Sequence, residues 1–271
     1  MKIRGILTVA TAASALLVGE VIQRTLIVAA IRLFPSRRES ILAFWQQALA
    51  RIMLGSATIV GGARQREIPS IPSGPGTLVL MNHQSVMDIP LVIRAMPHTY
   101  PRIVTRVRYA HGKPLISHMV RLYQYPTVDP GATVRSSLDD LRKQTASSPK
   151  PIVIFPEGSR TRDGALGKFR RMGLRAILGG RSWQVWIVAI DGWWEVARLT
   201  DFIDDVSNVE GRMSAIGPFT SPEPGESVGA FIAEMEQRMR RLFGELRGEL
   251  GPGEVAVGET GAGGLPTGET E

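Results

Sequence analysis

A regular alternation of short apolar runs with helix-type patterns constrains the fold of this 271-residue chain more than any other feature. Short runs rich in β-branched residues and bounded by turn residues predict buried strands, and the segments between them have the apolar spacing of helices. This alternation is typical of an α/β domain with a mostly parallel sheet flanked by helices. The predicted strands are 77–82, 102–107, 125–129, 151–155 and 184–190, and the predicted helices are 85–96, 113–123, 132–146 and 167–179.

Three regions are predicted along the chain. Residues 1–62 form an N-terminal membrane-associated helical region, and residues 63–250 form the α/β domain, which begins with a Pro/Gly/Ser-rich link over 69–76. Within it, apolar residues recur on one face of 225–247, which predicts an amphipathic helix. Residues 251–271 are rich in Gly and Glu and have nothing with which to build a core, so we expect them to be disordered.

The N-terminal segment 5–33 is apolar but is interrupted by Glu20, Gln23 and Arg24. Its uninterrupted part is about 15 residues long, which is short of the roughly 20 that a spanning helix needs. An interfacial or re-entrant anchor therefore fits best, with the arginines that follow binding lipid headgroups. Three alternatives remain: a signal peptide, a tilted spanning helix in which Glu20 and Arg24 reach the headgroups, and two ordinary core helices.

Composition narrows the classes of function. The chain has no cysteine, which excludes disulfides, thiolate metal sites and cysteine nucleophiles. The four histidines have no pair at the spacing of zinc ligands, so no metal is predicted. The net charge is +7, and the segment after Arg247 contains only acidic charges, so the body of the chain is strongly basic. This favours an anionic membrane surface or a phosphorylated substrate, and not nucleic acid, because the aromatic and basic patterns of RNA-binding modules are missing.

The apolar run 77–81 ends in Asn82-His83, and Asp88 follows five residues after the histidine. An imidazole and a carboxylate aimed at one point can take a proton from a hydroxyl. If a helix begins near Ser85, the Asp88 carboxylate reaches back and orients the imidazole. The alternative is structural: Ser85 and Asp88 have the spacing of a capping box, in which Asp88 only satisfies the helix start.

A second apolar run, 151–155, ends in Pro156-Glu157-Gly158-Ser159-Arg160. The planar guanidinium of Arg160 matches two phosphate oxygens, and Ser159 and the backbone amides of the turn add donors. The structural alternative is a tight turn in which Gly158 supplies an unusual backbone angle. More basic residues follow within a dozen positions: Arg162, Lys168, Arg170 and Arg171.

Asn82-His83-x4-Asp88 followed by Phe155-Pro156-Glu157-Gly158-Ser159-Arg160 resembles two blocks of the glycerophospholipid acyltransferase family, N-H-x4-D and F-P-E-G-[ST]-R. This family is typified by 1-acyl-sn-glycerol-3-phosphate acyltransferase, and the resemblance covers roughly residues 40–220. It implies that His83 is the catalytic base with Asp88 as its orienting partner. It also implies that Glu157, Gly158 and Arg160 bind the acceptor phosphate, beside Ser159. The basic stretch of Arg102, Arg106 and Arg108 resembles the family's segment between these blocks.

The resemblance implies an acyltransferase of phospholipid biosynthesis on the cytoplasmic face of the cell inner membrane. It would move a fatty acyl group from acyl-CoA or acyl-ACP (acyl carrier protein) to the free hydroxyl of lysophosphatidic acid, giving phosphatidic acid, without a cofactor. The expected partners are membrane lipids, the lysophospholipid acceptor and the thioester donor. The alternatives are another lyso-lipid acceptor, or a membrane lipid-binding protein that has lost turnover.

Two departures from the family pattern leave the acceptor open. The family's middle block usually ends in an arginine, as in I-F-I-D-R, whereas this chain has Asp129-Pro130, and Arg135 is the nearest substitute. The family's last block has the form V-P-V, whereas this chain reads Ile187-Val188-Ala189.

Overall fold

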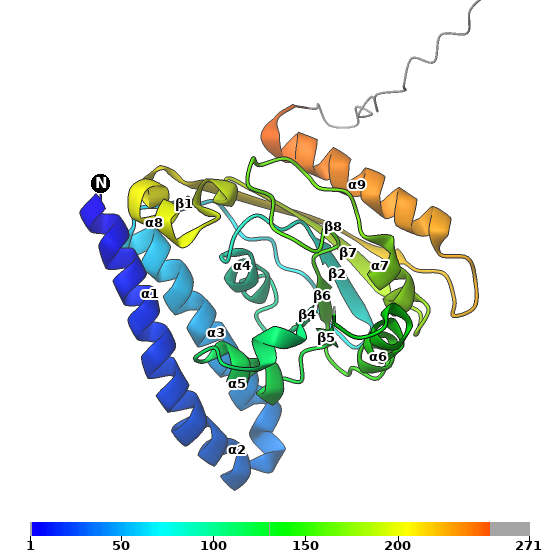
Figure 1. The fold of residues 1–271 in the computed structure, drawn as a ribbon, viewed down its shortest axis with the longest axis horizontal. Helices are drawn as coiled ribbons and strands as arrows, with labels where there is room; N and C mark the ends of the chain where they lie inside the picture. Colours follow the sequence, from blue (N-terminus) through cyan, green and yellow to red (C-terminus); the bar gives the residue numbers. More distant parts are fainter. Residues whose placement is uncertain (1, 130, 250–271) are drawn as a thin grey trace, which may run out of the picture.

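The structure is a computed structural model that describes residues 2–129 and 131–249, so the tail predicted over 251–271 lies outside the described residues. It has the predicted class, an α/β fold in which helices flank a mostly parallel sheet (Figure 1). The helices are α1 (Lys2–Ile22), α2 (Val28–Leu33), α3 (Arg38–Gly55), α4 (Asp88–Arg94), α5 (Ile116–Leu122), α6 (Val134–Ala146), α7 (Arg171–Leu178), α8 (Leu199–Asp205) and α9 (Gly229–Arg247). The strands are β1 (Arg64–Gln65), β2 (Thr77–Met81), β3 (Arg102–Ile103), β4 (Thr105–Arg106), β5 (Thr127–Val128), β6 (Ile152–Ile154), β7 (Gln184–Asp191) and β8 (Glu210–Thr220). Short helical turns are η1 (Gln23–Ile27), η2 (Pro35–Arg37), η3 (Ser56–Val60), η4 (Val107–Ala110), η5 (Trp193–Val196) and η6 (Val206–Asn208).

The main sheet has the strand order β1-β8-β7-β2-β6-β3. Its neighbouring strands are parallel except for β7 and β8, which are antiparallel. Because β2 pairs in parallel with both β6 and β7, the carboxyl ends of these three strands meet at one edge of the sheet. That edge is where open parallel sheets place their ligands. Both sequence motifs, which follow β2 and β6, are therefore brought together there.

Alternate residues of each strand point to opposite faces, which gives the domain two apolar cores. On one face, Val79 and Met81 of β2 pack with α3, α4 and α5. On the other face, Leu78 and Leu80 pack with α6, α7 and α9. Strands β2 and β6 and most of β7 are buried on both faces, which explains why these strands read as continuous apolar runs in the sequence.

The structure differs from the predicted elements at β8 and over 102–107, and it also contains β1 and α8, which were not predicted. Strand β8 was not predicted, because Gly211, Gly217 and Pro218 interrupt its apolar pattern and glycine and proline are usually depleted in strands. The single strand predicted over 102–107 is two strands in different sheets: the Val104 N–H still donates to the main sheet at Val153, whereas the next N–H, of Thr105, donates to Pro126 beside β5. The sequence pattern could not show this change of partner, because no glycine, proline or other turn residue separates the two halves of 102–107.

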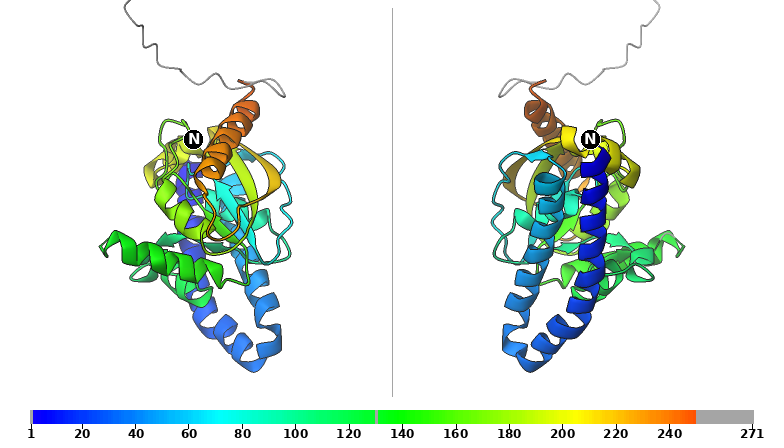
Figure 2. Two further views of the ribbon diagram at one scale, coloured as in Figure 1. Left: turned by 90° about the vertical axis from the view of Figure 1, so that its right-hand side faces the viewer. Right: turned by 90° about the vertical axis from the view of Figure 1, so that its left-hand side faces the viewer.

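The N-terminal helices form a hairpin whose α2 end projects beyond the rest of the molecule (Figure 2). The helical segment Lys2–Leu33 is continuous and, by length and composition, apolar enough to cross a membrane, with a mean hydropathy of 1.9 over its 18-residue window. Helix α3 shares the core of the sheet through Leu42, Trp45 and Leu49. Residues 2–60 therefore pack as part of the same body as the α/β domain.

Two of the polar residues that interrupt the N-terminal segment, Glu20 and Gln23, bond to the α/β domain and to α3. The Gln23 side chain is fully buried, and it accepts a hydrogen bond from Trp45 Nε1 (2.9 Å) and lies 2.9 Å from His118 Nδ1. Glu20 accepts the backbone N–H of Leu115 (2.6 Å) and pairs with Arg24. These residues dock the first helix onto α3 and α5, and this contact is a physical reason for their place in an apolar sequence.

Candidate active site

The carboxyl ends of β2 and β7 are joined by the side chain of Asn82, which directly follows β2. Its side-chain amide donates to the Ile190 carbonyl (2.9 Å) and accepts the Ile190 N–H (2.8 Å), so it closes the gap between the ends of β2 and β7. Asn82 is 1 % exposed. This reciprocal pair fixes the backbone immediately before His83.

The structure places His83 and Asp88 in direct contact. His83 Nδ1 lies 2.6 Å from Asp88 Oδ2. The same oxygen accepts the backbone N–H groups of Gln84 (2.7 Å) and Ser85 (3.0 Å), so the carboxylate is held by three donors. Because the carboxylate is the acceptor, Nδ1 carries the hydrogen and Nε2 keeps its lone pair. The Asp88 side chain is fully buried, whereas that of His83 is 19 % exposed, so only the imidazole can reach a substrate.

One half of the capping-box alternative is present, because the Asp88 carboxylate accepts the backbone N–H of Ser85. The other half is replaced, because the Ser85 hydroxyl donates to the Val196 carbonyl (3.1 Å) and the Asp88 N–H donates to the Ser85 carbonyl (3.4 Å) instead of to that hydroxyl. Asp88 does satisfy two backbone amides, but these belong to the loop ahead of the helix. Its carboxylate therefore both shapes the loop and orients the imidazole.

The imidazole is also held from one side by an aromatic ring. Phe155, at the end of β6, stacks on His83 with the ring centroids 4.1 Å apart and the planes 20° from parallel. The stacked ring limits rotation of the imidazole and so helps to fix the ring that Asp88 orients. The sequence analysis included Phe155 as the first residue of the second motif but assigned it no role.

Glu157, which the family resemblance assigns to the acceptor phosphate, bonds to the backbone of two other segments. Its two carboxylate oxygens accept the backbone N–H groups of His83 (2.8 Å) and Gly167 (2.7 Å). Burial raises the pKa of Glu157, and these two hydrogen bonds only partly offset that effect. With both oxygens bonded to the backbone, the carboxylate holds the His83 loop against the chain that follows β6, and a direct contact with a phosphate is disfavoured.

The turn after Glu157 is surrounded by arginines. Gly158 has φ +69°, and a Cβ there would lie 2.7 Å from Arg170 Cδ, so this position requires glycine. Arg106 donates to the Gly158 carbonyl (3.1 Å) from β4. Arg160 extends from the turn and donates to the Ala197 carbonyl (3.2 Å).

Tyr109 lies close to the arginines that surround this turn. The hydrogen bond from Arg108 (3.3 Å) lowers the pKa of Tyr109 despite its burial, and the charges of Arg160 and Arg106 lower it further. Arg106, Arg108 and Arg160 are therefore close together in space, although about fifty residues separate the first two from the third in the sequence, whereas Arg102 bonds Gln124 and Ser148. The residue that departs from the family pattern, Pro130, lies outside the described residues, and its suggested substitute Arg135 is exposed on α6.

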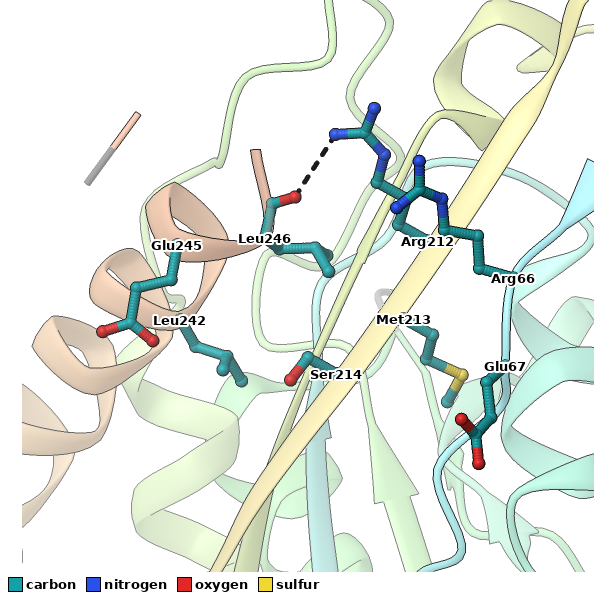
Figure 3. A pocket seen from close by; sticks show the side chains of 8 residues that line it. All are labelled: Arg66, Glu67, Arg212, Met213, Ser214, Leu242, Glu245 and Leu246. Atoms are coloured by element: carbon teal, nitrogen blue, oxygen red, sulfur yellow. Dashed lines mark hydrogen bonds between the residues drawn. The ribbon is translucent and has the colours of Figure 1, made fainter. Parts of the chain in front are cut away.

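Two surface pockets lie away from the imidazole. One, of about 360 Å³, lies between β8 and the end of α9 (Figure 3) and is lined by Arg66, Glu67, Arg212, Met213, Ser214, Leu242, Glu245 and Leu246. The other, of about 300 Å³, is lined by Arg162, Trp194, Glu195, Ala197, Arg198 and Asp201. Neither includes His83, Asp88 or Arg160.

The family and the fold of the chain are supported by comparison with known proteins. The family model described as acyltransferase matches residues 64–188. The crystal structure of the 1-acyl-sn-glycerophosphate (LPA) acyltransferase PlsC from Thermotoga maritima is similar, with a TM-score of 0.67 and 18% identity, over 91% of this chain and 98% of that chain. A search of curated proteins found no match. The structural likeness confirms the fold, and the family match confirms the resemblance that the two motifs indicate.

Proposed function

Because residues 64–188 belong to the acyltransferase family, we propose that this enzyme transfers a fatty acyl group from a thioester to the free hydroxyl of lysophosphatidic acid, giving phosphatidic acid. The observation that carries the proposal is the His83–Asp88 pair at the carboxyl edge of the sheet, with Arg160 on the adjacent turn. The similar PlsC from Thermotoga maritima is named for lysophosphatidic acid, which supports the choice of acceptor.

In this proposal His83 acts as the base. Its Nε2 removes the proton of the acceptor hydroxyl while the hydroxyl oxygen attacks the thioester carbonyl. The Nδ1–H bond to Asp88 holds the imidazole in the required tautomer and stabilises the imidazolium. When the tetrahedral intermediate collapses, the carbon–sulfur bond breaks and the imidazolium returns its proton to the leaving thiolate. The thioester is already activated, so the residues need only position the two substrates and move one proton.

The acceptor phosphate is proposed to bind the basic group around the turn after β6. Arg160 is the principal contact, Gly158 and Ser159 contribute the turn, and Arg106 and Arg108 add charge from the neighbouring segment. A guanidinium can bind two phosphate oxygens at once, which orients the acceptor as well as attracting it. We assign Glu157 to holding this turn against the His83 loop, because both of its oxygens are bonded to the backbone.

Arg160→Lys is expected to weaken use of the acceptor while leaving the donor nearly unaffected. Lysine keeps the charge but loses the two-pronged geometry, so we expect KM for lysophosphatidic acid to rise about tenfold and KM for the acyl thioester to change less than about twofold. The measurement is release of free thiol by purified protein, with acyl-CoA and acyl-ACP as alternative donors and a panel of lyso-lipids as acceptors. Equal changes for donor and acceptor would remove Arg160 from the phosphate site. Wild-type protein that releases no thiol with any acceptor would favour a lipid-binding protein without turnover.

We also propose that the outer face of the N-terminal hairpin attaches the enzyme to the cytoplasmic face of the inner membrane. The segment Lys2–Leu33 meets the length and composition of a membrane helix, and large apolar side chains are exposed along it. Gln23 and Glu20 bond to the α/β domain on the opposite side of the same segment, which supports an interfacial anchor in preference to a free spanning helix. The exposed apolar residues of the hairpin and its continuation are Ile3, Ile6, Leu7, Leu17, Val18, Val21, Leu26, Leu33, Phe34, Phe44, Ile52 and Ile59.

Replacing Val18, Val21 and Leu26 together by Gln is expected to release the enzyme from membranes. These side chains are 57 %, 61 % and 64 % exposed, so the substitution removes apolar surface without opening the core. Each buried aliphatic side chain contributes roughly 1.5–3 kcal/mol to transfer out of water, so binding to anionic vesicles should weaken by at least about a hundredfold. The control replaces Val134 and Met172 by Gln. These two side chains, on α6 and α7, are about as exposed as the three on the hairpin. If the triple variant still sediments fully with vesicles, the attachment lies elsewhere.

A further inference from the structure

The loop that carries Arg160 is held at its apex, residues 162–166, by a hydrogen bond from α9. The arginine loop, residues 158–170, connects the turn after β6 to α7 and has no helix or strand of its own. Its first part is held by the bond from the Thr161 N–H to the His83 carbonyl (2.9 Å), and its last part by the bond from the Gly167 N–H to Glu157. Across 162–166, within the described part of the chain, the one hydrogen bond to another segment is from Arg247 Nη2 to the Gly164 carbonyl (2.6 Å).

The apex is shaped to receive this guanidinium. Gly164 has φ +74°, and a Cβ there would lie 2.8 Å from both Arg247 Nη2 and the Trp194 indole. Any side chain at this position would push the loop off both groups, so glycine permits the close approach. The apex is thus packed between a residue of α9 and a residue of η5.

The same guanidinium reaches the catalytic loop through Asp191. Arg247 Nη2 pairs with Asp191 Oδ1 (2.9 Å) at the end of β7, and the two side chains are 22 % and 13 % exposed. Asp191 Oδ1 also accepts a hydrogen bond from Gln84 Nε2 (3.4 Å), and Gln84 is the neighbour of His83. One continuous set of contacts therefore runs from the arginine loop through Arg247 and Asp191 to the loop that holds the imidazole.

Arg247 is itself well fixed. Its guanidinium lies 4.5 Å from the ring centroid of Phe243, one turn back on α9. The last turn of α9 is in turn bonded to the sheet, because Arg212 of β8 donates to the Leu246 carbonyl (3.4 Å), as Figure 3 shows. The Arg247 guanidinium is held by α9, which is itself bonded to β8, so it can fix the loop at little cost in conformational entropy.

We propose that Arg247 is a positioning residue that sets the place of the arginine loop, and with it Arg160, relative to His83. This rests on the proposed function, in which Arg160 binds the acceptor phosphate. Arg247 touches neither substrate, and it lies beyond the segment that the family model matches. Its loss lets the loop apex move and therefore impairs use of the acceptor more than use of the donor.

The test compares Arg247→Met with Arg238→Met in the full-length protein. Arg238 is a close match, because it lies on the same helix, pairs with Glu234 at 2.7 Å and covers the Phe219 ring at 4.5 Å, but it is outside the site. Charge-assisted hydrogen bonds are the stronger class, so we expect KM for lysophosphatidic acid to rise about tenfold in Arg247→Met, with KM for the thioester within about twofold of wild type. Arg238→Met should keep both constants. If Arg247→Met does not fold, Arg247→Lys is expected to show the same pattern at smaller size.

Two further measurements separate positioning from a merely structural role. In an Arg160→Lys background, adding Arg247→Met should lower acceptor use by less than about twofold, because both changes act on the same contact. Limited trypsin digestion of the folded protein should cleave the arginine loop at least about fivefold faster in Arg247→Met than in Arg238→Met. Additive kinetic losses, equal cleavage rates, or equal effects on donor and acceptor would each overturn the proposal. If wild-type protein transfers no acyl group, the proposed function fails on its own, and the cleavage comparison still decides whether Arg247 holds the loop.

Discussion

His83→Ala is expected to lower acyl transfer at least about a hundredfold while the protein stays folded. Within the described residues, the imidazole is the one group at the carboxyl edge of the sheet that combines a partner carboxylate, a stacked ring and a partly exposed side chain. A positioned general base contributes on the order of 10²–10⁴ to rate, so its removal should cost at least the lower figure. The backbone N–H of His83 that bonds Glu157 is retained in the variant, so the loop should keep its anchor.

The measurement for His83→Ala is thiol release from the acyl thioester with lysophosphatidic acid, together with a melting curve. His98→Ala is a suitable control, because His98 lies exposed in the turn after α4. We expect the control to keep wild-type turnover and His83→Ala to keep a similar Tm. Turnover above about a tenth of wild type in His83→Ala would exclude this histidine as the base.

Asp88→Asn is expected to be the second most damaging change, with turnover reduced roughly 10²–10⁴-fold. The amide carries no charge, so it cannot stabilise the imidazolium that forms during the reaction. If the Asn oxygen keeps the three hydrogen bonds that Asp88 Oδ2 accepts, its NH₂ group takes the place of Oδ1. Oδ1 is buried without a partner among the described residues, so the NH₂ group would be buried there without an acceptor. If it turns the other way, the NH₂ faces Nδ1 and forces the hydrogen onto Nε2, where the acceptor hydroxyl must bind.

The Asp88→Asn experiment also measures how much of the role of Asp88 is structural. The side chain accepts the N–H groups of Gln84 and Ser85, so we expect a fall in Tm of several degrees. Turnover is therefore compared per folded molecule, below the melting transition. Lower Tm with wild-type turnover per folded molecule would mean that Asp88 only shapes the loop.

Local sequence patterns determined much of the α/β domain. The strands β2, β6 and β7 were predicted from continuous apolar runs, because a strand covered on both faces leaves a composition that is readable in a few residues. The His83–Asp88 pair was also readable, since a separation of five residues at a strand end lets one loop and the start of one helix bring the two side chains together. The motif order then indicated the family.

Tertiary structure decided which distant residues meet. Glu157 and the His83 N–H are 74 residues apart, and Arg247 and Gly164 are 83 residues apart, so nothing in the local pattern of either segment indicates the contact. Strand β8 was hidden by its own glycines and proline, and its place in the sheet comes from pairing with β7 and β1. Likewise, Glu20 and Gln23 read as breaks in an apolar helix until their partners on α3, on α5 and in the loop before α5 were known. Local patterns record burial and backbone preference, whereas contacts between distant segments depend on the order of the strands and on which helix ends the fold brings to the same edge.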